Sequence, residues 1–114
     1  MKIEFYELPD GSRPAMKFIQ SLDPKMEAKM LHTIDLLEEH GGALREPYSK
    51  PLGEGIFELR AQVGSNISRV LYFFFVGNSA VLTHGFIKKS QKTPSREIER
   101  AKRYRNDYEA GEGR

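Results

Sequence analysis

The sequence of 114 residues has no cysteine, which excludes disulfide bonds and thiolate metal clusters. Its longest apolar run, residues 70–76, is much shorter than the about 20 residues that a membrane-spanning helix needs. Residues 1–5 carry an acid where a secretion signal would carry basic residues and a long apolar core. We therefore expect a cytoplasmic protein without a membrane span, folded as one domain over residues 1–114.

Net charge is also small, +2, but its distribution along the chain is uneven. Residues 1–87 hold 9 basic and 11 acidic side chains, a net of −2. Residues 88–108 hold 8 basic and 3 acidic side chains, a net of +5. A positive end on a nearly neutral body favours a polyanion or an acidic protein as the partner, and a solvated basic helix face is the simpler alternative.

The first half of the chain has the pattern of one short strand and two helices. Ile3, Phe5 and Leu8, with Glu4 and Tyr6 between them, predict a short strand that is closed by the turn signal Pro9-Asp10-Gly11. Pro14 suits the first position of a helix that ends near residue 22, and Asp23-Pro24 is the start signal of a longer helix. That second helix ends at Gly41 and has one apolar stripe, formed by Met26, Met30, Ile34 and Leu37.

In the second half, the apolar residues change from helical spacing to alternation. Residues 43–55, rich in proline and glycine, are expected to form a loop, and strands follow over 57–63, 67–76 and 79–87. Thr93-Pro94 opens a helix over 95–109, whose thin apolar side predicts peripheral docking. The sequence thus predicts an α+β fold: an N-terminal strand and two helices, then a three-stranded antiparallel meander and a C-terminal helix.

Strand register predicts which polar side chains share a face of the sheet. If Gly77-Asn78 is a complete two-residue loop, Arg69, His84, Phe86 and Lys88 project from one face, and Tyr72 and Thr83 project from the other. A loop one residue longer would break this grouping.

Arg60 joins the same face if Gly64 and Ser65 form a two-residue loop, because Arg60 is then opposite Arg69. Two adjacent arginines repel each other unless an anion lies between them, so this register favours a phosphate site. The alternative is that Arg60 pairs with Glu58 or another carboxylate on the sheet.

Three lysines, Lys88, Lys89 and Lys92, precede the last helix, where a helix N-terminus favours anions over cations. They indicate a bound anion, most simply a phosphate, and a solvated lysine loop is the alternative. His84 has a reference pKa of about 6.5 and is a candidate proton carrier, although a structural histidine is commoner. Tyr72 is either a core residue or a second proton carrier. We find no Walker, GxGxxG, HExxH or CxxC motif, so we expect no metal and no cofactor.

Several segments together resemble the phage-derived HigB-like toxins of the RelE/ParE superfamily, and the similarity covers most of the chain. The segments are Phe57-Glu58-Leu59-Arg60, Arg69-Val70-Leu71-Tyr72, the run of residues 82–94 (LTHGFIKKSQKTP), and residues 97–101. The resemblance implies a small RelE-like toxin of a type II toxin–antitoxin pair. Such toxins are ribosome-dependent endoribonucleases that cut mRNA in the ribosomal A site without a metal. The ribose 2′-OH attacks the adjacent phosphate and leaves a 2′,3′-cyclic phosphate and a 5′-OH. The implied partner is a helix-turn-helix antitoxin of the HigA type, which neutralises the toxin and represses the operon.

On this interpretation the catalytic candidates are Arg69, Lys88, His84, Arg60 and Tyr72. The residues expected to contact RNA are Lys88, Lys89, Lys92, Arg96, Arg100 and Arg103. Some relatives use acidic and histidine groups near the C-terminus, where this chain has Asp107-Tyr108-Glu109 and no histidine, so the general base stays open. Two alternatives are a non-catalytic ParE-like toxin that binds DNA gyrase, and a plain RNA-binding module.

Overall fold

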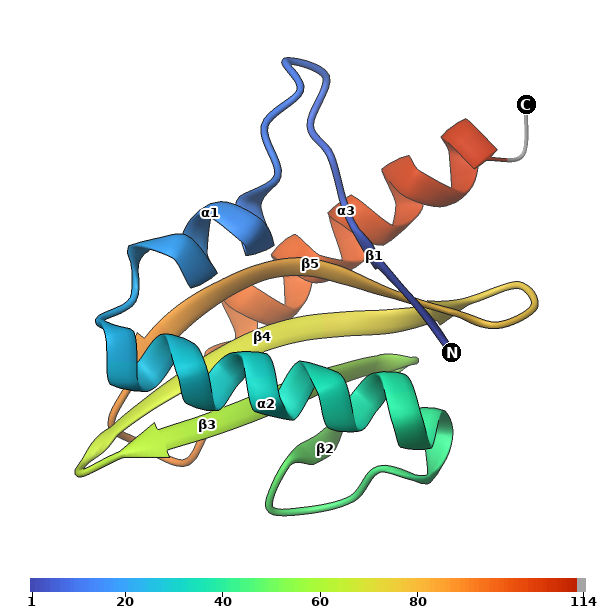
Figure 1. The fold of residues 1–114 in the computed structure, drawn as a ribbon. Coiled ribbons are helices and arrows are strands. Elements are labelled where there is room, and N and C mark those ends of the chain that lie inside the picture. Colours follow the sequence, from blue (N-terminus) through green and yellow to red (C-terminus); the bar gives the residue numbers. More distant parts are fainter. Residues whose placement is uncertain (113–114) are drawn as a thin grey trace.

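The computed structural model describes residues 1–112, in which helices flank one five-stranded sheet (Figure 1). The sheet has the order β1-β5-β4-β3-β2; β1 is parallel to β5, and the other neighbours are antiparallel. This arrangement confirms the predicted α+β class. The elements are β1 (Lys2–Phe5), α1 (Pro14–Ser21), α2 (Pro24–His40), η1 (Gly41–Ala43), β2 (Ser49–Gly53), β3 (Ile56–Val63), β4 (Asn66–Phe75), β5 (Ser79–Lys88) and α3 (Ser95–Glu112).

One strand was not predicted. β2 lies inside the segment expected to be a loop and pairs with the first half of β3. Pro51 and the glycines around it argued against a strand, but β2 is an edge strand, where a missing backbone N–H is tolerated. The antiparallel meander therefore has four strands instead of three.

The helix boundaries predicted for the first half are confirmed, and those of α2 are marked by its caps. The Asp23 side chain accepts hydrogen bonds from the backbone N–H groups of Lys25 and Met26, and α2 ends at Gly41, whose φ of 54° is in the region that glycine favours. The predicted apolar stripe of α2 is buried against the sheet, together with α1. No helix of residues 1–112 is long and apolar enough to cross a membrane.

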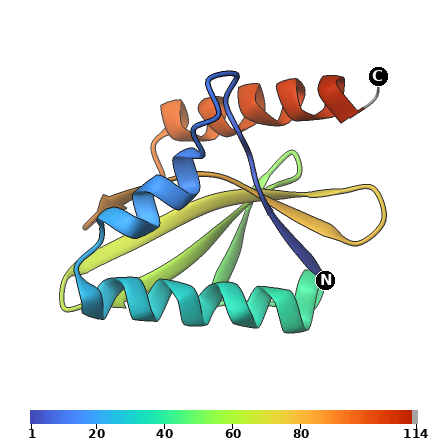
Figure 2. The same cartoon turned by 45° about the horizontal axis from the view of Figure 1, so that its top comes forward.

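The core has two layers, one on each face of the sheet; Figure 2 shows α2 and α3 on opposite sides. α3 packs more closely than its thin apolar side predicted. Ala101 is completely buried, and the Tyr104 ring stacks on Tyr6 with 4.6 Å between ring centres. The Tyr6 hydroxyl also donates a hydrogen bond to Asp107 at 2.6 Å. The residue that follows β1 is thereby joined to α3.

The β4–β5 hairpin contains two departures from the predicted register that cancel. Phe75 pairs with Ser79, so the loop has three residues and the predicted two-residue loop is wrong. A bulge between Leu71 and Tyr72 leaves one extra residue in β5, Thr83, whose hydroxyl donates to the carbonyl of Leu71. Beyond the bulge the predicted pairs are all observed: Leu71 with His84, Arg69 with Phe86, and Ile67 with Lys88. The longer loop therefore did not break the grouping.

Candidate functional site

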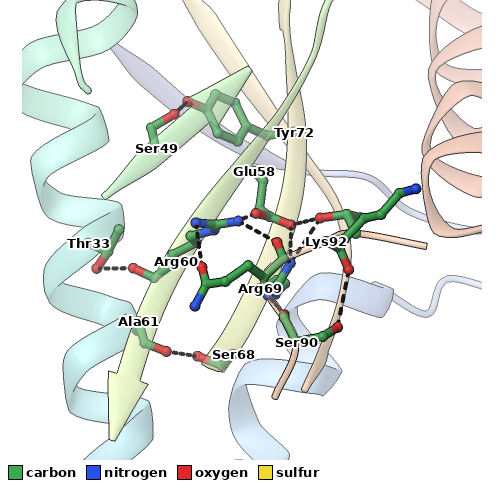
Figure 3. Close-up of polar contacts among 12 residues, drawn as sticks. Thr33, Ser49, Glu58, Arg60, Ala61, Ser68, Arg69, Tyr72, Ser90 and Lys92 are labelled. Atoms are coloured by element: carbon green, nitrogen blue, oxygen red, sulfur yellow. Dashed lines mark hydrogen bonds and ion pairs between the residues drawn. The ribbon is translucent and has the colours of Figure 1, made fainter. Parts of the chain in front are cut away.

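A buried ion cluster joins β3 and β4 (Figure 3). Arg60 is opposite Arg69, as the two-residue loop at residues 64–65 predicted. Glu58 Oε2 accepts a hydrogen bond from Arg60 Nε at 2.6 Å, and Glu58 Oε1 is 3.3 Å from Arg69 Nη1. Glu58 and Arg69 are completely buried, and the Arg60 side chain is 14% exposed. The anion between the two arginines is therefore the Glu58 carboxylate of the chain itself. Arg60 thus has the carboxylate partner that the sequence offered as the alternative to a bound phosphate.

The two arginines also hold the backbone of residues 88–92, which we call the lysine loop. Arg69 Nη2 donates to the carbonyl of Ser90, and Arg69 Nη1 donates to the carbonyl of Gln91 at 3.1 Å. Arg60 Nη2 donates to the same Gln91 carbonyl at 2.9 Å. The cluster thus ties a surface loop to the centre of the sheet through hydrogen bonds from charged donors, which are stronger than neutral ones.

Thr93 was predicted as the cap of the last helix, but its hydroxyl is bonded within the cluster. Its Oγ1 accepts a hydrogen bond from Arg69 Nη1 at 3.0 Å and donates one to Glu58. Thr93 is 7% exposed, so it closes the cluster from the side of α3. Arg69 Nε is the one buried side-chain polar atom of the described residues without a hydrogen-bond partner.

The carbonyls of Ser90 and Gln91 point toward the arginines, whereas the three lysine side chains of the loop differ in exposure. Lys89 and Lys92 are exposed and Lys88 is half-buried. Figure 3 shows the Lys92 amine directed away from the cluster. Within the part of the chain that the structure describes, none of the three forms an ion pair. A fixed backbone that carries three unpaired ammonium groups suits the binding of a phosphate.

His84 lies on the predicted face but is shielded by α3. It is 3% exposed, its Nε2 is 3.1 Å from Glu97 Oε1, and its Nδ1 is 3.1 Å from Thr83 Oγ1. Burial lowers the pKa of His84, and the nearby Glu97 carboxylate opposes that effect. Both ring nitrogens of His84 thus have partners in this structure, and contact with a substrate would require α3 to move.

Tyr72 lies on the opposite face of the sheet from the cluster, as predicted from its register. Its hydroxyl is 2.5 Å from Ser49 Oγ, and its ring is 1% exposed within the core under α1 and α2. Figure 3 shows the Ser49–Tyr72 pair apart from the ion cluster. Burial raises the pKa of Tyr72, while the bond to Ser49 lowers it by less. The structure therefore separates Tyr72 from the other four catalytic candidates.

The basic side chains of α3 have two different environments. Arg96, Arg100 and Arg103 are exposed, as an RNA-contacting surface requires, and Arg100 Nη1 is 3.9 Å from Glu97 Oε1 within the same helix. Lys102 instead forms an ion pair with Glu54, and Arg105 donates to the Glu54 carbonyl, so these two attach α3 to the turn between β2 and β3. Part of the positive charge counted in the sequence thus stabilises the packing of α3.

The sequence interpretation missed the central position of Glu58. The signal was present, because Glu58 is two residues before Arg60 and alternation places both on one face of β3. Among the described residues, no group of three or more histidine or acidic side chains is placed to hold a metal ion.

A family model described as "Phage derived protein Gp49-like (DUF891)" matches residues 17–106. That range includes the ion cluster, the lysine loop and most of α3. A search of curated proteins finds no match to the chain.

Proposed function

Since the chain belongs to the phage-derived Gp49-like family, which is of the toxin–antitoxin type related to RelE and HigB, we propose that it is a ribosome-dependent endoribonuclease that stops translation by cutting mRNA. The family implies a cognate antitoxin as partner. We propose that this antitoxin is a helix-turn-helix protein of the HigA type. The structural observation that supports an RNA-directed activity is the lysine loop, whose unpaired ammonium groups stand on a backbone fixed by Arg60 and Arg69.

In the proposed reaction the ribose 2′ oxygen forms a bond to the adjacent phosphorus, and the bond from phosphorus to the 5′ oxygen breaks. The 2′-OH gives up its proton and the departing 5′ oxygen gains one, which leaves a 2′,3′-cyclic phosphate and a 5′-OH. Negative charge increases on the non-bridging phosphate oxygens during this step. Cations held in place before the reaction stabilise that charge without further reorganisation.

The proposed roles follow from where each side chain lies. Lys88 and its neighbours in the lysine loop hold the scissile phosphate, and Arg60, the more exposed of the two arginines, supplements their charge. Arg69 acts through the loop backbone that it binds. His84 is the proposed proton carrier when α3 moves away from it. Tyr72 lies across the sheet, so we leave it out of the reacting groups.

The exposed arginines of α3 extend the same positive surface. We propose that Arg96, Arg100 and Arg103 contact ribosomal RNA, through phosphates and shape and without reading bases. This surface and the lysine loop are continuous in sequence, since α3 follows the loop directly.

The deciding experiment combines the purified protein with programmed 70S ribosomes and an mRNA that has a defined A-site codon. We expect a cut within that codon, a cyclic phosphate at the new 3′ end, and no cut when ribosomes are omitted. The Lys89→Ala variant should cut more slowly, and Lys17→Ala, which changes an exposed lysine of α1, is the matched control. An intact mRNA on ribosomes shown to be active would contradict the proposal, and DNA gyrase supercoiling would then be measured.

A further inference from the structure

A cavity of about 620 Å³ opens at the edge of the sheet, between α2, β3 and the turn before β2. It exists because β2 pairs with β3 only as far as Leu59, so the rest of β3 has β4 on one side and no strand of the described chain on the other. Side chains of α2 bond this edge instead. Thr33 donates to the carbonyl of Arg60 at 3.3 Å, and Lys29 donates to the carbonyl of Gln62 at 3.0 Å. These carbonyls are satisfied, but the space that a neighbouring strand would occupy is left open.

The lining of this cavity suits a flat, partly apolar group with hydrogen-bonding edges. Tyr48 and His32 bring aromatic rings to it, and the Tyr48 side chain is 40% exposed although it is large and apolar. The side-chain amides of Gln62 and Gln91 offer both donors and acceptors. The apolar part of the wall consists of Ala28, Pro47, Ala61 and Ile67. The volume is within the range of about 300–1,000 Å³ that is typical of small-molecule sites.

Charge at the cavity favours a ligand that carries an anion. The lining carries the cations Lys29 and Arg60 and the carboxylate of Glu46, and the Glu58 carboxylate that pairs with Arg60 is shared with Arg69. These three cations and two carboxylates leave a net charge of +1 beside the cavity. An apolar side chain of a protein partner would cover these cations and amides without bonding to them, which is unfavourable. A nucleotide supplies an aromatic base, polar base edges and a phosphate, so it matches each part of the lining.

The cavity is continuous with the lysine loop through Gln91. Gln91 lines the cavity and also belongs to the lysine loop, and its Oε1 accepts a hydrogen bond from Arg60 Nη1 at 3.4 Å. We propose that this cavity holds one unpaired nucleobase of an RNA strand, stacked on Tyr48, while the lysine loop binds the backbone phosphate next to it. This inference rests on the proposed function and adds to it a subsite for a base.

The test measures binding of a fluorescent single-stranded RNA of about six nucleotides to the full chain by anisotropy. Stacking on an aromatic side chain contributes about 1–3 kcal/mol per base, so Tyr48→Ala should weaken binding about tenfold and Tyr48→Phe should retain it. The matched control is Leu31→Ala, because Leu31 is 46% exposed on α2 and does not line the cavity. The hydrogen bond between Arg60 and Tyr48 runs from the backbone N–H of Arg60 to the backbone carbonyl of Tyr48, so the substitution keeps it.

Two further measurements separate a base subsite from general charge attraction. The slope of log affinity against log salt should be unchanged in Tyr48→Ala, whereas Lys89→Ala should reduce it by about one phosphate contact. An RNA of the same length without bases should bind the wild type and Tyr48→Ala equally.

The outcomes distinguish this inference from the proposed function. Cleavage and RNA binding that are unchanged in Tyr48→Ala would overturn the base subsite and leave the endoribonuclease standing. Unchanged RNA binding together with lost antitoxin binding in Tyr48→Ala would assign the cavity to a protein partner, and would also overturn the inference. A wild-type chain that fails to cut mRNA but binds RNA through Tyr48 would support the subsite and contradict the proposed activity.

Discussion

Arg69 and Glu58 form a completely buried ion pair between adjacent strands, with 3.3 Å between Arg69 Nη1 and Glu58 Oε1. Neither charge contacts solvent, so each depends on the other and on the hydrogen bonds around it. Through Arg69 the pair is also bonded to the backbone of the lysine loop. The buried Arg69–Glu58 pair therefore also holds the lysine loop in position at the surface.

Removing the acid of this pair should strongly destabilise the fold. Glu58→Ala leaves Arg69 buried without its counterion, and we expect a loss of about 3–5 kcal/mol in the free energy of unfolding. Urea unfolding followed by circular dichroism measures it. The double variant Glu58→Leu/Arg69→Met, which removes both charges, should be more stable than Glu58→Ala; a double variant that is equally unstable would show that the charge pairing is not the cause.

The conservative variant Arg69→Lys should loosen the lysine loop. A lysine ammonium cannot bond at once to the carbonyls of Ser90 and Gln91 and to Thr93 in the planar arrangement of a guanidinium. We expect faster amide hydrogen exchange in residues 88–93 and a cleavage rate at least about tenfold lower, with KM changed less than kcat. Unchanged exchange in that segment would contradict the positioning role of Arg69.

Exposed lysines of the loop should affect RNA affinity but not stability. Lys89→Ala and Lys92→Ala remove ammonium groups that have no ion pair in the described chain, so the unfolding free energy should change by less than about 0.5 kcal/mol. Each variant should bind single-stranded RNA more weakly. Each should also reduce the slope of log affinity against log salt by the amount expected for about one phosphate contact. Lys17→Ala on α1 should do neither, and a similar effect in that control would point to general charge attraction.

Burial of His84 should make stability depend on pH. Its pKa is lower in the folded chain than in the unfolded chain, so the unfolded state takes up the proton more readily. The contribution of His84 to stability is therefore present above the ordinary histidine pKa and decreases as the pH falls below it. Urea unfolding at pH 7.5 and pH 5.5 should show a smaller pH-dependent loss in His84→Gln than in the wild type. Equal losses of unfolding free energy in both proteins would exclude His84 as a source of the pH dependence.

Gly85 should not accept a side chain, since α1 packs directly on it. A Cβ at position 85 would lie 2.2 Å from Phe18 Cδ2, and we expect Gly85→Ala to lose about 1–3 kcal/mol of stability. The companion change Phe18→Leu should recover part of the loss in thermal unfolding. Gly42→Ala, where a Cβ meets nothing within 4 Å, is the matched control.

Patterns within a single element were reliable predictors because they depend on local chemistry. Asp23 with Pro24 located the start of α2, Gly41 located its end, and alternation located β3. Gly64 and Ser65 predicted the pairing of Arg60 with Arg69. β2 was missed because its proline and glycines oppose a strand locally, and pairing with β3 outweighs that preference.

The sequence by itself determined the α+β class, the two N-terminal helices and the basic segment, since these depend on residue type and spacing. The face shared by Arg69 and His84 was predicted from a two-residue loop, and it is observed because a bulge at Thr83 offsets the third loop residue. Only the tertiary structure decided which groups bond to Arg69. Its partners, Glu58 and Thr93 among them, are 11 to 24 residues away along the chain, and they meet because the sheet buries Arg69 where water cannot satisfy it. Burial of His84 beneath α3 likewise follows from helix packing. The cavity beside Tyr48 depends on where β2 ends, which strand pairing decides.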